Sequence, residues 1–263
     1  MRTKTFVVAS AALSAVFLFA QRHAAPAPVQ LPGVIDLTHA ISEKAPNWEG
    51  TVESPYKAKP VGTFAKEGYF TRTISLPEHF ATHIDAPAHF AQGVWSVDQI
   101  PPQRLIAPLV VIDVRGKAAN DSDYEVSLED VAVWEHDNGE VPHGAVVMAL
   151  TGWESRWDSM KSYRNADEKG AMHFPGFALE TVKFLVQARR IVGLGIDTLS
   201  VDYGPSKDFP VHHFTARNNV YHLENVASLD KAPEAGGIVV VAPAKLEGGS
   251  GGPVRIFVLL KQP

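Results

Sequence analysis

Four side chains of the kinds that bind metals and carry protons fall within eleven residues of this chain. They are His79, His83, Asp85 and His89, at spacings of four, two and four residues. Because side chains two apart in an extended segment point to the same side, we expect His83 and Asp85 to face together. Pro87 excludes a continuous helix through the run, and a turn at residues 81–82 would bring the first histidine to the same side.

This set suits a divalent cation. Two imidazoles and a carboxylate are ordinary ligands of Zn²⁺ or Mn²⁺, and a bound cation lowers the pKa of its water toward about 7. The resulting hydroxide is a nucleophile at neutral pH, and His89, just beyond the three ligands, is placed to move protons. The alternative is an incidental group of surface or core histidines, which fits any one of these residues better than it fits all four.

A second cluster of the same residue types lies more than a hundred residues later. It contains the pair His212-His213, then His222 and Glu224. Glu224 stands among apolar residues, and a carboxylate buried without a partner is costly, so it needs a cation. That cation is either a metal or an arginine. The three histidines cannot all be ligands, and their spacing does not choose among them.

The pattern of apolar residues predicts a single domain of mixed α/β class to hold these groups. Short runs rich in Val, Ile and Leu predict strands, some of them covered on both faces. They are residues 33–37, 70–76, 109–114, 145–150, 191–196, 238–242 and 254–260. One helix is expected after the capping box of Ser127 and Asp130, and a second over residues 179–190.

Two further features have both a functional and a structural interpretation. Residues 247–253, Glu-Gly-Gly-Ser-Gly-Gly-Pro, lack the Lys-Ser/Thr ending of a phosphate-binding loop, so we interpret them as a tight loop between the last two strands. Trp48, His173, Phe174 and Phe177 could shape an aromatic pocket, although Phe174 and Phe177 fit core packing at least as well.

Composition excludes some classes of function. The 263 residues are 45% apolar, which is typical of a globular protein, and the net charge of −5 with no basic run gives no support for nucleic-acid binding. Without cysteine, there can be no disulfide, and any metal must be held by His, Asp and Glu.

The first residues predict export. Arg2 and Lys4 precede an apolar stretch from Phe6 to Ala20, and small residues follow. We therefore predict a secretory signal and short lead-in over residues 1–27, one globular domain over 28–263, and a periplasmic or secreted protein that leaves the membrane once the signal is removed. The alternative is an uncleaved anchor, but the stretch is short for a membrane span.

The run from His79 to Phe90 resembles the signature His-x-Gly-Thr-His-x-Asp-x-Pro-x-His-Phe of the metal-dependent cyclase family, which includes bacterial kynurenine formamidases and isatin hydrolases. Ala81 stands where the family usually has Gly. The resemblance extends over nearly the whole mature chain, through residues 35–38, 46–50, 195–202 and 223–226.

By position, the resemblance implies a first metal on His79, His83 and Asp85, a second on Asp85, His212 and Glu224, His89 as general acid/base, and Trp48 in the substrate pocket. It also implies one or two Zn²⁺ or Mn²⁺ ions, the swivelling β/β/α fold of the family, and a homodimer or larger oligomer. The expected reaction is hydrolysis of an amide C–N bond, as in the conversion of N-formylkynurenine to kynurenine and formate.

Two alternatives to the formamidase remain. One is a hydrolase of isatin or of another cyclic amide or ester, because both chemistries use the same step and the same metal motif. The other, from a different class, is an exported protein that binds a metal and a small ligand without turnover, although a mere binder has no need of His89.

Overall fold

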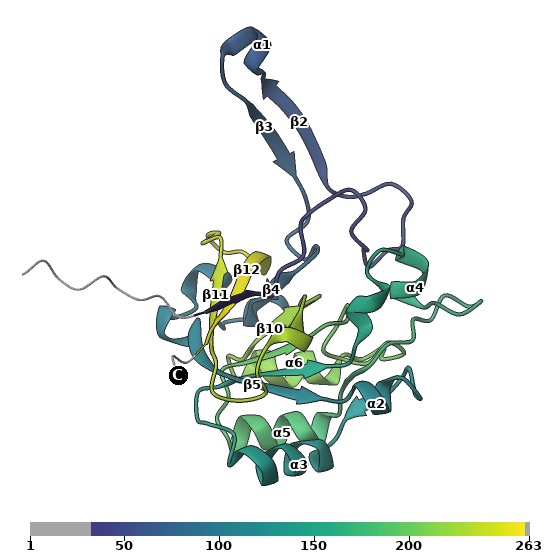
Figure 1. Cartoon of the computed structure of the whole chain (residues 1–263), viewed down its shortest axis with the longest axis vertical. Helices are drawn as coiled ribbons and strands as arrows, with labels where there is room; N and C mark the ends of the chain where they lie inside the picture. The colour runs from purple at the N-terminus through teal and green to yellow at the C-terminus, as the bar shows by residue number, and fades with distance from the viewer. Residues whose placement is uncertain (1–32, 261–263) are drawn as a thin grey trace, which may run out of the picture. The chain divides into compact units, whose positions relative to one another are not determined.

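The computed structural model of the chain describes residues 33–260, which are organised around an eight-stranded mixed sheet (Figure 1). The strand order is β1-β12-β11-β5-β7-β9-β10-β4. The strands are β1 (Val34–Asp36), β4 (His83–Asp85), β5 (Ile106–Asp113), β7 (Val146–Leu150), β9 (Gly193–Ile196), β10 (Tyr221–Glu224), β11 (Ile238–Pro243) and β12 (Gly251–Leu259). The strands β5, β7, β9 and β10 run parallel, and the other pairings within this sheet are antiparallel.

The sheet closes on itself through its longest strand. One edge of β12 pairs with β11, while its other edge pairs with β4 at Gly251–Pro253 and with β1 at Phe257–Leu259. Because β4 also pairs with β10, the strands form a closed, barrel-like mixed sheet. This closure brings the strand that carries His83 beside the strand that carries Glu224.

Helices connect the parallel strands and cover the outer face of the sheet. Helix α3 (Leu128–Asn138) lies between β5 and β7, and α5 (Leu179–Gln187) lies between β7 and β9, side by side in Figure 1. Helix α6 (Pro210–Arg217) precedes β10 and packs on α5. The remaining elements are short: α1 (Phe64–Glu67), α2 (Arg115–Ala118), α4 (Met160–Arg164), β6 (Glu125–Val126), β8 (Gly176–Phe177) and the 3-10 helices η1 (Pro87–His89), η2 (Val97–Gln99), η3 (Pro102–Arg104), η4 (Trp153–Arg156) and η5 (Leu229–Lys231).

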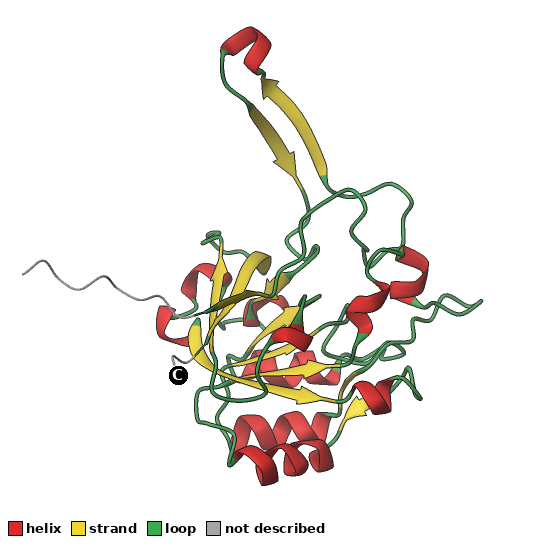
Figure 2. Cartoon of the chain, in the orientation of Figure 1, coloured by secondary structure: helices red, strands yellow, loops and turns green. Residues whose placement is uncertain are grey.

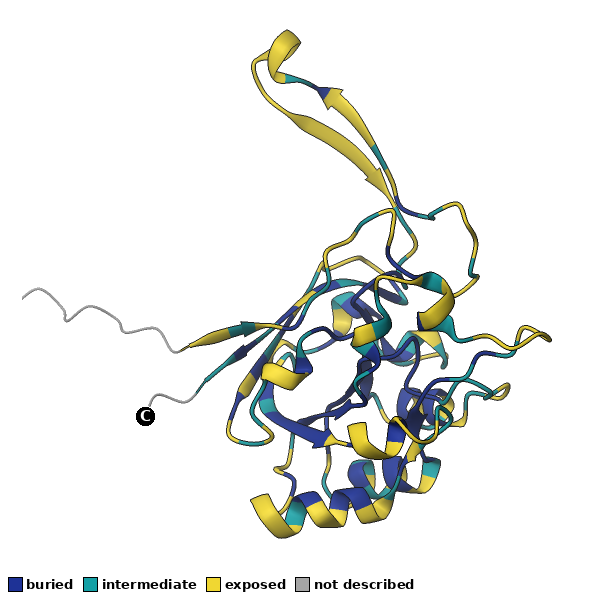
Figure 3. Cartoon of the chain, turned by 45° about the vertical axis from the view of Figure 1, so that its right-hand side comes forward, coloured by how far each residue is buried: buried dark blue, intermediate teal, exposed yellow. Residues whose placement is uncertain are grey.

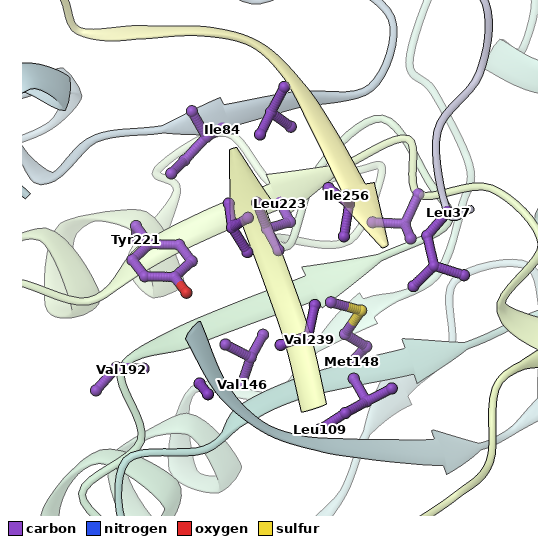
Figure 4. Close-up of a cluster of buried hydrophobic side chains, with 14 of the residues drawn as sticks. Leu37, Ile84, Leu109, Val146, Met148, Val192, Tyr221, Leu223, Val239 and Ile256 are labelled. Carbon is purple, nitrogen blue, oxygen red and sulfur yellow. The ribbon is translucent and has the colours of Figure 1, made fainter. Parts of the chain in front are cut away.

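Alternate residues of β5 serve two different cores. Leu109 and Val111 join the cluster between the strands that Figure 4 shows, with Met148, Leu223 and Ile256. Val110 and Ile112 join the cluster beneath α3 and α5. Both sides of this strand are therefore buried, as its continuous apolar run predicts.

A hairpin extends from this framework. Strands β2 (Lys57–Gly62) and β3 (Thr71–Ser75) pair only with each other among the described residues, and α1 connects them. Figure 2 shows the two strands as a separate hairpin, and Figure 3 shows that nearly every residue of them is exposed. The exposed side chains include the apolar Val61, Phe64, Tyr69, Phe70 and Ile74.

The structure confirms the mixed α/β class, all seven predicted strands and both predicted helices. Ser127 and Asp130 form the expected reciprocal cap at the start of α3. The glycine-rich residues do connect the last two strands, although β12 already begins at Gly251. The predicted signal over residues 1–27 lies outside the described residues. Across residues 33–260, no helix is both long enough and apolar enough to cross a membrane.

Candidate metal centre

Strands β4 and β10 form the floor of a buried polar cluster. Their antiparallel register sets His83 opposite Glu224 and Asp85 opposite His222. Because alternate residues of a strand share a face, these four side chains lie on one side of the ladder. All four are 3 to 4% exposed. The expectation that His83 and Asp85 face together is therefore confirmed.

The chain makes a tight turn to bring His79 to the same place. Ala81 adopts a left-handed conformation, with φ of 56°, two residues before β4. The carboxylate oxygen Oδ1 of Asp85 then lies 2.6 Å from Nδ1 of His79 and 3.1 Å from Nε2 of His83. This is the turn that the sequence predicts at residues 81–82.

Helix α6 contributes a further imidazole, that of His212, to the cluster on β4 and β10. Pro210 occupies its first turn, where a missing N–H costs nothing. Nε2 of His212 lies 3.3 Å from both Asp85 Oδ2 and Glu224 Oε1. Glu224 Oε2 also lies 3.5 Å from Nε2 of His83. Within residues 33–260, neither carboxylate has a Lys or Arg partner, so the arginine alternative for Glu224 is wrong.

The histidine rings are held by their far nitrogens. Nδ1 of His83 donates to the carbonyl of Ala81 at 2.9 Å, and Nδ1 of His212 bonds to Asp202 at 2.7 Å. A carbonyl or carboxylate only accepts, so each ring carries a proton on Nδ1 and directs Nε2 at the acidic side chains. Such outer partners are a regular feature of metal-ligating histidines.

His79 is held in the opposite orientation. Its Nε2 lies 2.9 Å from Ser250 Oγ, and this hydroxyl donates to Glu78 at 2.6 Å. Because the hydroxyl gives its one proton to the carboxylate, it accepts from Nε2, and the ring directs Nδ1 at Asp85. A Cβ on Gly251 would lie 2.7 Å from this ring, so glycine is required there. The glycine-rich residues thus position His79.

The two buried carboxylates of the cluster are stabilised by nearby positive charge. Burial acts to raise the pKa of Asp85, but hydrogen bonds from His212, His79 and His83 outweigh it and hold that pKa well below its usual value. Burial acts to lower the pKa of His83, yet Asp85 and Glu224 raise it to about 9. Two buried carboxylates therefore hold imidazolium protons, which a divalent cation would replace. The donor set of imidazoles and carboxylates fits Zn²⁺ or Mn²⁺.

His89 lies beside the cluster without belonging to its buried core. Its ring stacks on His79 with 3.9 Å between centroids, and its Nε2 is 4.0 Å from Asp85 Oδ2. Burial lowers the pKa of His89 to about 4. At neutral pH the ring of His89 is therefore an uncharged imidazole at the edge of the site.

A cavity of about 380 Å³ opens onto these groups. Its polar wall includes His79, His83, Asp85, His89 and Glu224. Its apolar wall includes Pro46, Trp48, Phe80, Phe90, Leu199 and Phe209.

Trp48 lines the cavity as predicted, with its ring 6.1 Å from that of Phe209. The other members of the predicted aromatic pocket do not line the cavity, although the ring of Phe174 lies 6.5 Å from that of Trp48. Phe174 and Phe177 are fully buried in the core, and His173 pairs with Asp123 away from the cavity. Phe90 and Phe209 line the cavity instead, and their spacing in the sequence gave no sign of it.

All six predicted ligand and proton-transfer residues therefore meet around one space, together with a seventh that the sequence left open. His222 is fully buried beside His212, whereas His213 is exposed. The two-residue spacing of His222 and Glu224 within a strand would have placed them on one face. No comparable pattern connects Asp202 to His212, because an irregular loop separates them.

The comparisons with known proteins agree with this geometry. Residues 35–203 match the family described as "Putative cyclase". The isatin hydrolase of Roseibium aggregatum is 36% identical over 193 residues, which are 70% of this chain and 73% of that protein. A kynurenine formamidase of Paracidovorax citrulli is 24% identical over 84% of this chain and 93% of its own length. Among solved structures, isatin hydrolase A from Ralstonia solanacearum is similar with a TM-score of 0.81 and 32% identity, covering 87% of this chain and 92% of that one.

Proposed function

The chain belongs to the cyclase family, and from this membership we propose that it is a metal-dependent hydrolase that opens a small cyclic amide of the isatin type. The observation that carries the proposal is the buried cluster of histidines around Asp85 and Glu224, at the wall of an apolar cavity. The similarity to isatin hydrolases at 30% identity or more supports the choice of a lactam.

The chain's own groups have separate roles in this proposal. We assign His79, His83 and Asp85 to a first cation, either Zn²⁺ or Mn²⁺, and Asp85, His212 and Glu224 to a second. A bound divalent cation supplies Lewis acidity and an acidified water. His89, at the edge of the cluster and facing the cavity, takes a proton from the attacking water and delivers it to the leaving nitrogen.

The apolar wall orients the substrate. An aromatic lactam buries its ring against Trp48, Phe90 and Phe209, which leaves its carbonyl toward the polar wall. The three rings come from separate segments, and neighbouring centroids are 5.6 to 6.1 Å apart. At this spacing the rings pack against one another, so they form one continuous aromatic wall for a planar ligand.

A parallel assay of isatin and N-formylkynurenine tests the proposal. We expect the protein loaded with Zn²⁺ or Mn²⁺ to open isatin, and a chelator to abolish turnover until the metal is restored. His89→Ala should keep its metal and lose about 10²–10⁴-fold in kcat. His136→Ala, at an exposed histidine, is the matched control.

Two results would contradict these roles. Full activity of His89→Ala at neutral pH would remove the acid/base assignment. Metal binding without turnover of any amide or lactam would favour the alternative of an exported binding protein.

Arylformamidase activity is the second candidate. It is supported by similarity to kynurenine formamidases along 84% or more of this chain. Faster hydrolysis of N-formylkynurenine than of isatin would select it. Either outcome leaves the cleavage of an amide C–N bond by the same residues in place.

We also propose that the chain is exported and self-associates. The basic start and apolar stretch of the sequence support export, which is tested by fractionation and by the mass of the mature N-terminus.

The exposed apolar side chains of the β2–β3 hairpin support a homo-oligomer, because an isolated hairpin is marginal in water. Light scattering of the wild type beside Phe64→Ser/Phe70→Ser tests this, and a monomeric wild type would contradict it.

A further inference from the structure

One buried histidine of the cluster has no role in the function proposed above. His222 lies on β10, two residues before Glu224 and directly opposite Asp85. Its side chain is 4% exposed, and its Nδ1 has no hydrogen-bond partner among the described residues. Leaving a ring nitrogen buried without a partner is costly, so this atom needs an explanation.

The far side of the ring fixes where its proton lies. Nε2 of His222 is 2.6 Å from Oγ1 of Thr215. That hydroxyl also lies 2.8 Å from the carbonyl of Val211 and 3.1 Å from the carbonyl of His212. The carbonyls only accept, so the single hydroxyl proton points to them, and Oγ1 accepts from Nε2–H. A neutral His222 therefore carries its lone pair on Nδ1.

That lone pair faces a carboxylate. Nδ1 lies 4.0 Å from Oδ2 of Asp85, which is too far for a hydrogen bond. A lone pair opposite a buried carboxylate is unfavourable unless a cation or a water lies near both. The ligand atoms of Asp85, His212, His222 and Glu224 all lie within 4.8 Å of one another. Around a tetrahedral zinc ion, ligand atoms that lie ~2.0 Å from the ion are ~3.3 Å from one another. Nε2 of His212 lies at this distance, 3.3 Å, from an oxygen of Asp85 and from an oxygen of Glu224.

The space beside this ring is small. A cavity of about 10 Å³ lies against Asp85, His89, His212 and His222. It has room for a single ion or water. Three of the four candidate ligands, Asp85, His212 and His222, therefore border this space, and the fourth, Glu224, lies 3.3 Å from His212 Nε2.

From this geometry we infer that His222 is a metal ligand through Nδ1 and completes the second cation site with Asp85, His212 and Glu224. The inference rests on the metal centre of the proposed function, and it adds one protein ligand to it. Thr215 is then a positioning residue, because its hydroxyl holds the proton on Nε2 and leaves Nδ1 free.

Metal binding by matched variants tests the inference. Full-length protein is stripped with a chelator and titrated with Co²⁺ and with Zn²⁺, with calorimetry and elemental analysis as readouts. We expect His222→Leu to lose one ion per chain or to bind that ion about 100-fold more weakly. Removing an outer partner of a ligand already weakens binding by about 10–100-fold, and removing the ligand itself should cost at least as much. His213→Leu, at the exposed neighbour of His212, should bind as the wild type does.

Two further measurements keep the test informative if His222→Leu folds poorly. Thr215→Val should lower the affinity for the same ion by roughly 10-fold or more, because the His222 ring is then free to change tautomer. In zinc-loaded wild type labelled with ¹⁵N-histidine, the His222 ring should show a proton on Nε2 and a metal-shifted Nδ1.

The outcomes separate this inference from the proposed function. Unchanged stoichiometry and affinity in His222→Leu, or a proton on Nδ1 in the loaded wild type, would overturn the ligand and indicate a bridging water. Loss of an ion in His222→Leu with no amide hydrolysis by the wild type would support the ligand and reject the function.

Discussion

The cluster has two halves of different origin. The β4 half contains His79, His83 and Asp85, which a single turn and strand bring together. The β10 half combines His212 from a helix with His222 and Glu224 from the strand that follows. Spacing along the chain determines geometry only within one regular element. The β4 half is therefore visible in the sequence, whereas the β10 half depends on how α6 packs over β10.

The halves also differ in how their rings are held. In the β4 half, His83 bonds to the carbonyl of Ala81 and His79 to the hydroxyl of Ser250. In the β10 half, the hydroxyl of Thr215 holds His222, but the carboxylate of Asp202 holds His212 and also accepts its backbone N–H. A charged partner makes the stronger hydrogen bond and raises the basicity of the ring. We expect the β10 half to depend more on its outer partner.

Asp85 connects the two halves, so its loss should have the largest effect. Its two oxygens contact rings of both halves. We expect Asp85→Asn to lose metal from both and to lower kcat/KM by more than about 10³-fold, because a cation supplies several kcal/mol to the transition state. Elemental analysis and turnover measure this. Asp113→Asn, at an exposed ion pair, is the control, and a variant that kept one ion with near-normal turnover would show that the halves work separately.

The same division explains what the sequence could predict. Long apolar runs such as residues 109–114 predict strands because a buried strand needs little else, and Ser127 with Asp130 is a local cap. Strands β4 and β10 went unpredicted because three or four polar-rich residues carry no apolar period. Their pairing, and that of β4 with β12, joins residues well over a hundred positions apart, which local patterns do not encode.

The contact between the segments that carry the two halves, which Thr82 and Asn225 make, should lose stability in acid. Thr82 Oγ1 donates to the carbonyl of Asn225 and accepts from the backbone N–H of His39. The ring of His39 stacks on Trp157, and burial lowers its pKa to about 4. A depressed pKa means that stability is present above the unfolded value near 6.5 and is lost as pH falls toward 4.

His39→Phe isolates this contribution. A shift of that size corresponds to about 3 kcal/mol of unfolding free energy in the wild type. The variant keeps an aromatic ring on Trp157 but has no proton to bind, so the difference in stability between pH 7 and pH 4 should shrink by about that amount. Urea unfolding of the metal-free protein at both pH values measures it, with His136→Phe as the exposed control. Equal pH dependence in His39→Phe and the wild type would exclude His39 as the source.

The outer partners test the difference between the halves directly. Asp202→Asn should lower the affinity of the β10 half for its ion by about 10–100-fold, which is the usual effect of losing such a partner. Ser250→Ala should weaken the ion of the β4 half by less, because a neutral hydroxyl contributes less than a carboxylate. Calorimetric titration of both variants gives the comparison, and a larger loss from Ser250→Ala would reverse our ranking of the halves.

The turn of the β4 half should give the smallest effect. Ala81 has a φ of 56° and is 1% exposed. A left-handed conformation costs an L-residue roughly 1–2 kcal/mol. Glycine would remove that strain, but it would lose about 0.8 kcal/mol of methyl burial and about 0.4–1 kcal/mol through the freedom of the unfolded chain. Because these terms nearly cancel, Ala81→Gly should change the unfolding free energy by less than about 1 kcal/mol. Ala81→Val should destabilise more, because a β-branched side chain fits this conformation poorly. Denaturant unfolding of the two variants measures both, and a gain of several kcal/mol in Ala81→Gly would mean that the turn is held under strain by the metal-binding segment itself.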